Sequence, residues 1–341
     1  MHLRPLAAFY IRRGSYRPRC RELPVQRFRC RACKRNFSRQ TFRLDYRDKR
    51  PECNEQVLKL LVSATGLRQI GRVTRLSVHG VQYKFRKIAR GMRQMNRNLL
   101  RRLPAKRFAF LLDEFETFEH SSILPLTVPT LIDRESFAIL AVAVAPIRRV
   151  SKLGSPRRNW LMRHEREHGK RPDRSRACVR KVLGRLQRLL GNLPADMITD
   201  EKPLYSALLR RMFRGQVVQQ TVSSRQPRTT YNPLFRINLT EEMLRDNVGR
   251  MRRRSWLVSK SQKQLRAHLE VYAAWRNWHR RRTNEDPEHR TPAVVIGLAE
   301  RSFGYGEMLA WRQDWRDRSI YPTCTRGDRC VGLGNIQTSL A

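Results

Sequence analysis

Acidic residues are scarce in this 341-residue chain: 29 Asp and Glu stand against 72 Lys and Arg, a formal net charge of +43. Such a charge repels itself unless a polyanion neutralises it, so we expect a nucleic-acid partner. An RNA-binding protein of ribosomal type and a peripheral protein on an anionic membrane would carry a similar charge. The cations are spread along the whole chain among aromatic and aliphatic residues, which favours a long DNA path over a single polybasic tail.

Long apolar runs are also missing. The longest, Phe137–Ala145, has nine residues, far short of the roughly 20 that cross a bilayer. A short apolar stretch near the N-terminus is followed at once by Arg12 and Arg13, without a small-residue cleavage site, so no secretory peptide is predicted. Seven cysteines, an odd number, indicate a reducing compartment rather than a disulfide framework. We therefore expect a soluble cytoplasmic protein with no membrane contact.

A second CxxC pair is absent, and the one present is formed by Cys30 and Cys33. A CxxC turn brings two thiolates to one tetrahedral ion and is half of a zinc ribbon. Cys20 and Cys53 have no close Cys or His partner in the sequence. The pair is therefore either half of a Zn²⁺ site or two cysteines without a metal, in a small loop-rich module that we place at residues 1–53.

Apolar residues recur at helical spacing over residues 54–103, with Gly66 and Gly80 as punctuation. A turn at residues 77–80, followed by a helix with amide and cationic side chains, is typical of a helix-turn-helix DNA-binding domain. The alternative is an amphipathic hairpin with a solvated basic face. If the second helix enters the major groove, the side chains that we expect to contact DNA are Gln82, Lys84, Arg86 and Lys87.

From Phe108 the pattern changes to short apolar runs that alternate with helical stretches, which predicts an α/β domain over residues 104–290. Strands are expected at 108–112, 126–132, 137–145, 196–199 and 216–222. Helices are expected at 176–190, 204–213, 241–254 and 262–279. Residues 291–341 show little periodicity and form a C-terminal tail in this interpretation.

The first of these strands delivers Asp113, followed by Glu114 and Glu116, and Asp200 ends another strand. Carboxylates gathered at strand ends are costly to hold together unless a cation lies among them. Two strand-borne aspartates and one helical carboxylate can hold two Mg²⁺ or Mn²⁺ ions about 4 Å apart, which activate water and stabilise the leaving 3′ oxygen in phosphoryl transfer. Taken singly, each aspartate is equally compatible with a surface acid or a strand-end cap.

The order of these features resembles the bacterial insertion-sequence transposases of the DDE class that carry an N-terminal zinc ribbon. The resemblance spans about residues 26–277. Besides the CxxC module and the helix-turn-helix pattern, it is carried by the segments DEFETFEH at 113–120, ITDEKPLY at 198–205, NLTEEMLR at 238–245 and RSWLVSK at 254–260. It implies an RNase H-like catalytic domain with a mixed central sheet flanked by helices.

The resemblance also implies a function: metal-dependent cleavage and strand transfer at the ends of an insertion sequence. The implied partners are double-stranded DNA of the terminal inverted repeats and of the target, together with further copies of the chain in a homo-oligomer on DNA. The implied location is the bacterial nucleoid. The implied cofactor is Mg²⁺ or Mn²⁺, with Zn²⁺ in the N-terminal module if its cysteines bind metal.

Asp113 and Asp200 match the first two metal-ligand positions of the family motif, which makes both catalytic by resemblance. An Asn-x-x-Glu pattern selects Glu241 as the third ligand, and Glu242 and Asp246 are the alternatives on the same helix. The basic segment that follows is expected to track DNA phosphates through Arg250, Arg253 and Lys260.

The chain departs from the family pattern at its N-terminus, where the upstream CxxC of the ribbon is absent, and this leaves recognition of DNA ends open. Two alternative functions remain. One is a catalytically inactive DNA-binding remnant or domesticated repressor. The other is a nuclease of the same fold without strand transfer.

Overall fold

The computed structural model describes residues 9–20, 22–148, 153–223, 225–227, 229–252 and 256–312. It begins with a small antiparallel sheet in the order β1-β2-β3, with bounds Tyr10–Tyr16, Val25–Cys30 and Asn36–Ser38. Aromatic rings hold this sheet together: Phe28 stacks on Phe37 with 5.4 Å between ring centroids and meets Tyr10 edge-on at 4.9 Å. Because each ring buries a large area, an aromatic cluster suits a module too small for an aliphatic core.

Three helices follow: α1, α2 and α3, with bounds Cys53–Leu61, Leu67–Thr74 and Val78–Leu100. Helix α2 ends at Arg75, which takes a left-handed φ of 54°, and α3 begins after Ser77, whose hydroxyl accepts a hydrogen bond from the Gly80 N–H at 3.1 Å. A Cβ at Gly71 would lie 2.8 Å from the carbonyl oxygen of Leu76, so the turn requires glycine there. A three-residue turn, 75–77, therefore joins α2 to α3.

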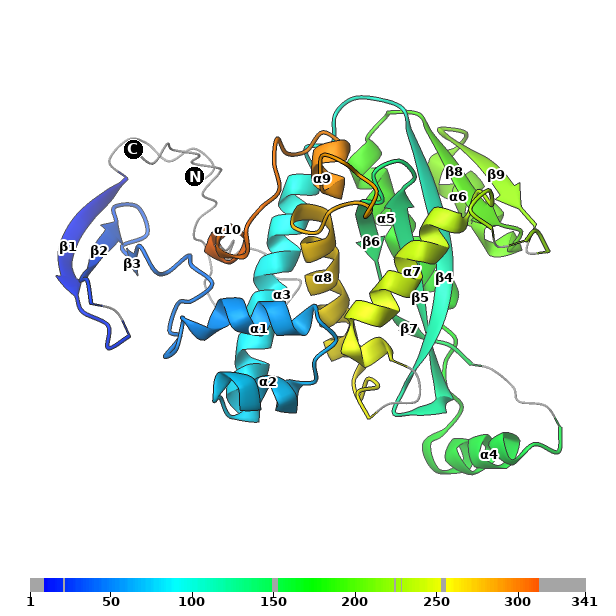
Figure 1. Ribbon diagram of the computed structural model, residues 1–341, viewed down its shortest axis with the longest axis horizontal. Coiled ribbons are helices and arrows are strands. Elements are labelled where there is room, and N and C mark those ends of the chain that lie inside the picture. The colour runs from blue at the N-terminus through cyan, green and yellow to red at the C-terminus, as the bar shows by residue number, and fades with distance from the viewer. Residues whose placement is uncertain are drawn as a thin grey trace.

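A mixed sheet forms the centre of the rest of the chain (Figure 1). Its strands lie in the order β6-β5-β4-β8-β9, and the short β7 pairs with β5. Strand β5 is antiparallel to β4 and β6 is antiparallel to β5, whereas β8 and β9 run parallel to β4. In chain order the bounds of these six strands are Phe108–Glu119, Ser121–Asp133, Ile139–Val142, Ala145–Pro146, Ala195–Asp200 and Val217–Val222.

Helices cover both faces of this sheet (Figure 1). Helices α5 and α6, with bounds Ser175–Leu190 and Pro203–Phe213, pack on the face that carries Phe110 and Leu112. Helices α3, α7 and α8, the last two with bounds Phe235–Asn247 and Gln262–Trp278, pack on the face that carries Leu111 and Phe115. The core under α3, α7 and α8 also includes the buried side chains of α1 and α2, so the N-terminal helices and the sheet share one continuous apolar cluster.

Several segments differ from the sequence expectation. Strand β4 continues to Glu119, seven residues beyond the expected end at 112, and β5 begins at Ser121, five residues before the expected start at 126. The strand expected at 137–145 is divided into β6 and β7. It does not begin at Phe137, because that residue takes a left-handed φ of 62° in a turn whose N–H groups donate hydrogen bonds to Asp133. Helix α7 starts six residues before the expected Glu241 and ends at Asn247. The extended backbone of Val248 ends the helix, and the 3₁₀ segment Gly249–Met251 follows where the helix was expected to continue. A Cβ at Gly249 would lie 2.6 Å from the carbonyl oxygen of Ala64, so this turn requires glycine.

The predicted tail is partly folded onto the core. It contains the short helices α9 and α10, with bounds Pro292–Val295 and Tyr305–Ala310, and α10 packs on α1 and α3. The indole N–H of Trp275 in α8 donates to the hydroxyl of Tyr305 at 3.1 Å. The rest of the tail, residues 313–341 with Cys324 and Cys330, lies outside the described residues.

Helix α4, Pro156–His168, projects from the body of the molecule beyond the ends of β4 and β5 (Figure 1). Leu161 is the one buried residue of this helix, and Trp160 is 65% exposed. Over the part of the chain that the structure covers, no helix has both the length and the apolar composition needed to span a bilayer.

Candidate active site and nucleic-acid-binding residues

The two aspartates singled out in the sequence lie side by side in the centre of the sheet. Strands β4 and β8 are parallel, and their last registered pair joins Leu112 to Thr199. Asp113 and Asp200 follow this pair by one residue on each strand. Both also share a face of the sheet with Leu111 and Ile198, which belong to the core under α3, α7 and α8. The parallel register therefore brings together two carboxylates that are 87 residues apart in the chain.

Both aspartates accept backbone hydrogen bonds, and Asp113 is partly buried. Its Oδ1 accepts a hydrogen bond from the Glu114 N–H at 2.7 Å, and Oδ1 of Asp200 accepts one from the Lys202 N–H at 3.1 Å. Burial raises the pKa of Asp113 above its ordinary value, and the nearby charge of Asp200 raises it further. A divalent cation between the two carboxylates would remove this repulsion, so the donor set fits Mg²⁺ or Mn²⁺.

Glu114 points to the opposite face of β4 and forms a buried polar network there. Its side chain, 5% exposed, accepts hydrogen bonds from the hydroxyl of Thr127 at 2.7 Å and of Tyr205 at 3.1 Å, and it forms an ion pair with Lys202. Burial, followed by the charge of Glu114, raises the pKa of Tyr205. The network ties β4 to the loop after Asp200 and to the start of α6. The sequence interpretation missed these roles of Lys202 and Tyr205, although both lie within the ITDEKPLY segment.

The third predicted acid, Glu241, lies on α7. Ile237 and Leu244, one turn to either side of it, are buried in the core on the aspartate face, and Glu241 is 5% exposed. The alternatives face elsewhere: the Glu242 side chain is 66% exposed and pairs with Arg245, and Asp246 is exposed. Of the three candidates, Glu241 is the one that shares a side of the molecule with Asp113.

The described residues contain no group of three His, Cys, Asp or Glu side chains close enough to hold a metal ion. This applies both to the carboxylates of the sheet and to the N-terminal cysteines. Cys30 is buried at the end of β2, and Cys33 lies in the turn that leads to β3. Cys53 is buried at the start of α1, where its Sγ lies 3.8 Å from Oε1 of Glu52. Zinc binding by Cys30 and Cys33 therefore stays a prediction.

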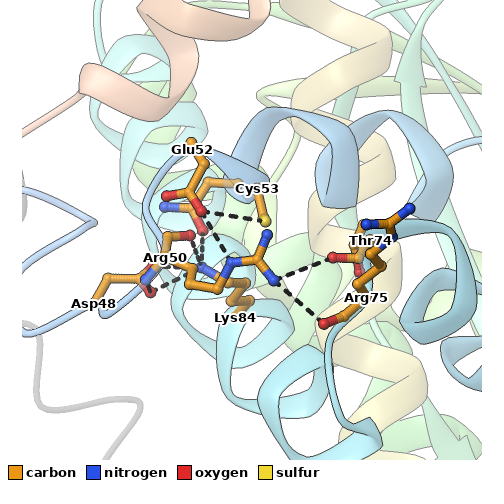
Figure 2. Close-up of polar contacts among 8 residues, drawn as sticks. Asp48, Arg50, Glu52, Cys53, Thr74, Arg75 and Lys84 are labelled. Atoms are coloured by element: carbon orange, nitrogen blue, oxygen red, sulfur yellow. Dashed lines mark hydrogen bonds and ion pairs between the residues drawn. The ribbon is translucent and has the colours of Figure 1, made fainter. Parts of the chain in front are cut away.

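The burial of Lys84 corrects the prediction that this side chain contacts DNA. Its side chain is 3% exposed, and its Nζ donates to both carboxylate oxygens of Asp48 at 2.8 Å, to the carbonyl of Arg50 at 2.6 Å and to Oδ1 of Asn54 at 2.8 Å (Figure 2). Arg50 extends this network to the carbonyl oxygens of Thr74 and Arg75 at the end of α2. The ammonium anchors the linker before α1 to the helices and is not available to DNA.

The other predicted DNA-binding side chains on α3 differ in exposure. Arg86 is exposed and Gln82 is half-buried, on the outer side of α3 next to Tyr83, which is 48% exposed. Lys87 is half-buried because its Nζ donates to the carbonyl of Tyr46, and burial lowers its pKa. The first turns of α3 therefore present Gln82 and Arg86 to the surface.

The basic segment after α7 is only partly exposed. Arg250 is half-buried with its guanidinium 5.8 Å from the centroid of the Phe85 ring, and burial lowers its pKa. This side chain packs the 3₁₀ turn against α3, and its contact with DNA phosphates stays a prediction. Lys260 is exposed, whereas Arg253 lies outside the described residues.

No family model and no curated protein matches the chain. Among solved structures, it is similar to the "Mos1 transposase paired-end complex with left transposon end", with a TM-score of 0.26 and 11% identity over 66% of this chain and 76% of that chain. It is also similar to the "Crystal structure of the Mos1 mariner paired end complex with Mn", with a TM-score of 0.25 and 12% identity over 65% and 76%. At these TM-scores the similarity bears on neither fold nor function.

Proposed function

We propose that the chain is a DDE-type transposase that cuts DNA at the ends of an insertion sequence and joins the freed ends to target DNA. The observation that carries this proposal is the pairing of Asp113 with Asp200 on adjacent parallel strands at the centre of a mixed sheet. In so basic a chain, two acids held together in a partly buried position are best explained by a divalent cation.

The topology supports an RNase H-like assignment of the domain. Numbered along the chain, and apart from β7, the strands lie in the order third, second, first, fourth and fifth, and the second strand alone is antiparallel to the first. The family resemblance implies a mixed central sheet flanked by helices, and this sheet is of that kind. The first acid lies on the first strand and the second acid ends the fourth, so both aspartates are strand-borne, as expected for the first two metal ligands.

Three groups of residues have separate roles in the proposed reaction. Asp113, Asp200 and Glu241 would hold Mg²⁺ or Mn²⁺, which supplies activation of water and charge neutralisation at the scissile phosphate. The network of Glu114, Lys202 and Tyr205 holds the loop after Asp200 against β4 and so fixes the spacing of the two aspartates. Exposed cations hold the DNA backbone.

The N-terminal modules would recognise the DNA. Helices α2 and α3 have the short turn of a helix-turn-helix, and Gln82 and Arg86 lie where a recognition helix places its base-reading side chains. The first module would add contacts, with Zn²⁺ at Cys30 and Cys33 if they bind metal. The expected partners are the terminal inverted repeats, the target DNA and further copies of the chain, in the bacterial nucleoid.

The deciding experiment is cleavage and joining of a DNA fragment that carries the sequences flanking the gene, with and without Mg²⁺ or Mn²⁺. Asp113→Asn and Asp200→Asn should abolish both reactions while DNA affinity stays within about twofold. Asp196→Asn is the matched control, because this exposed aspartate lies on the same strand, pairs with Arg107 and should leave cleavage intact. Metal-dependent cleavage without joined products would indicate a nuclease instead of a transposase.

A DNA-binding remnant is the second candidate. It is favoured by the absence, in the described ranges, of three acids close enough to hold one ion. Under this function the protein binds the same DNA tightly and produces no metal-dependent products. Asp113→Asn then leaves the DNA affinity unchanged.

A further inference from the structure

A cluster of cations surrounds one buried carboxylate at the β6 edge of the sheet, which α5 and α8 contact and where α8 packs on α3. The carboxylate is Glu270 of α8, which is 3% exposed. The cations of this cluster come from the three helices and are Arg93, Arg97, Lys181, Arg185, Arg188 and Arg266. We call this set the cation junction.

The floor of the cation junction is built from ion pairs that leave donors unused. Glu270 accepts from Nη2 of Arg97 at 3.3 Å, and its other oxygen lies 4.0 Å from Nη1 of Arg185. The Arg185 side chain is 13% exposed, and its Nη2 is buried without a hydrogen-bond partner among the described residues. Such a donor is costly to bury unless an acceptor reaches it.

The rim of the junction is open to solvent. Lys181 and Arg188 are exposed, and they lie on the same side of α5 as Arg185, one turn before it and one turn after it. Arg97 retains 29% of its side-chain exposure. A ligand can therefore approach from the rim and reach the guanidinium of Arg185 below it.

The charge balance of the junction is strongly positive. Glu270 is the carboxylate that attracts both Arg185 and Lys181, whereas cations on all three helices repel them. Burial lowers the pKa of Arg185 to about 10, and Arg97, Arg188 and Arg93 lower it as well. Burial lowers the pKa of Lys181, as does the neighbouring Arg266. These cations repel one another, and an anion among them would relieve that repulsion.

We propose that the cation junction is a binding site for the phosphodiester backbone of double-stranded DNA, separate from the Asp113–Asp200 pair. Guanidinium forks match phosphate oxygens in geometry, and partial burial strengthens the contact because water competes less. Strands β4 and β5 lie between the junction at β6 and the second aspartate on β8, so the two sites hold different parts of the duplex. The choice of ligand rests on the proposed function, whereas the site itself requires no catalysis.

The test is the salt dependence of binding to a short fluorescent duplex in EDTA, where cleavage plays no part. The double variant Lys181→Gln, Arg188→Gln should reduce the slope of log K against log salt by about 0.9 for each phosphate that is no longer neutralised, which is about 1.8 in total. The matched control is Arg210→Gln, Arg211→Gln, which removes two exposed cations from the neighbouring α6 and should leave the slope unchanged. An equal fall in both variants would show a general field effect and overturn the site.

Arg185→Gln tests the floor and separates the two sources of phosphate. Inorganic pyrophosphate should raise the melting temperature of the wild type in EDTA, and this rise should be absent in Arg185→Gln, which should also bind the duplex with a reduced salt slope. Stabilisation by pyrophosphate without any change in the duplex slope would mean a free-phosphate site and overturn the DNA assignment. A wild type that pyrophosphate does not stabilise, with unchanged slopes in all variants, would show that the cluster only packs the helices together.

Discussion

Replacing Asp113 by Asn should make the metal-free protein more stable, although it removes a charged residue from the centre of the proposed active site. Asp113 and Asp200 repel each other, and burial already disfavours the charged form of Asp113. The amide keeps the shape of the side chain and can still accept the Glu114 N–H hydrogen bond. The substitution therefore removes a repulsion without leaving a cavity.

The size of the effect follows from Coulomb's law. Neighbouring strands lie about 4.8 Å apart, and two unit charges about 5 Å apart interact by about 3 kcal/mol at an effective dielectric constant of 20. Partial exposure of both carboxylates and the nearby Lys202 reduce this value, so we expect a net gain of about 1 kcal/mol, or roughly 2 °C in melting temperature for a chain of this length. Because the folded-state pKa of Asp113 is raised, the gain should be present above that pKa and absent below the ordinary value of 3.8.

Metal ions should reverse the order of stability. At a Mn²⁺ concentration 100-fold above its dissociation constant, the wild type should gain about 2.7 kcal/mol, whereas Asp113→Asn should gain little. Differential scanning fluorimetry in EDTA and in Mn²⁺ measures both effects, with Asp196→Asn as the control that keeps the metal response. A less stable Asp113→Asn in EDTA, or equal stabilisation of both proteins by Mn²⁺, would refute the paired-carboxylate site.

Two further predictions concern buried ionisable side chains outside the carboxylate pair. Lys84→Met should destabilise the fold by about 3–5 kcal/mol, because it leaves Asp48 buried without its cation; denaturant unfolding measures this, and the double variant with Asp48→Leu should recover most of the stability. Burial lowers the pKa of His268 to about 4, so the stability that its neutral ring provides is complete above pH 6.5 and is lost as the pH falls toward 4. The decrease should amount to about 3 kcal/mol, and it should disappear from the pH profile of His268→Gln, whose amide can still donate to the carbonyl of Leu61. An unchanged profile in that variant would assign the acid sensitivity to other groups.

The sequence was informative where chemistry and periodicity are local. The two aspartates were visible from the apolar runs before them, and α5, α6 and α8 begin within one residue of the expected positions. The end of the first strand was wrong, because β4 continues past Asp113 to Glu119. The pairing of β4 with β8 was not visible, because register between strands 87 residues apart depends on the packing of both faces.

Burial of charge was harder to predict. Lys84 is one of several cations on a basic helix, and its partner Asp48 lies 36 residues earlier in the linker. Glu114 was a better case, since strand alternation places it opposite Asp113, on a face whose preceding residues, Phe108, Phe110 and Leu112, are apolar. That pattern signals a buried carboxylate, but only the fold supplies its partner Lys202, 88 residues away.

Helix α3 sets a fixed distance within the molecule. Its 23 residues span about 35 Å. Gln82 and Arg86 lie in its first turns, and Arg97 of the cation junction lies 15 residues after Gln82, about 22 Å along the helix axis. On the proposed function, a single rigid rod would therefore keep sequence reading and backbone contact at a constant separation of about two thirds of a turn of B-form DNA. Moving the two bound sites apart by several base pairs would leave one end of the rod without its contact.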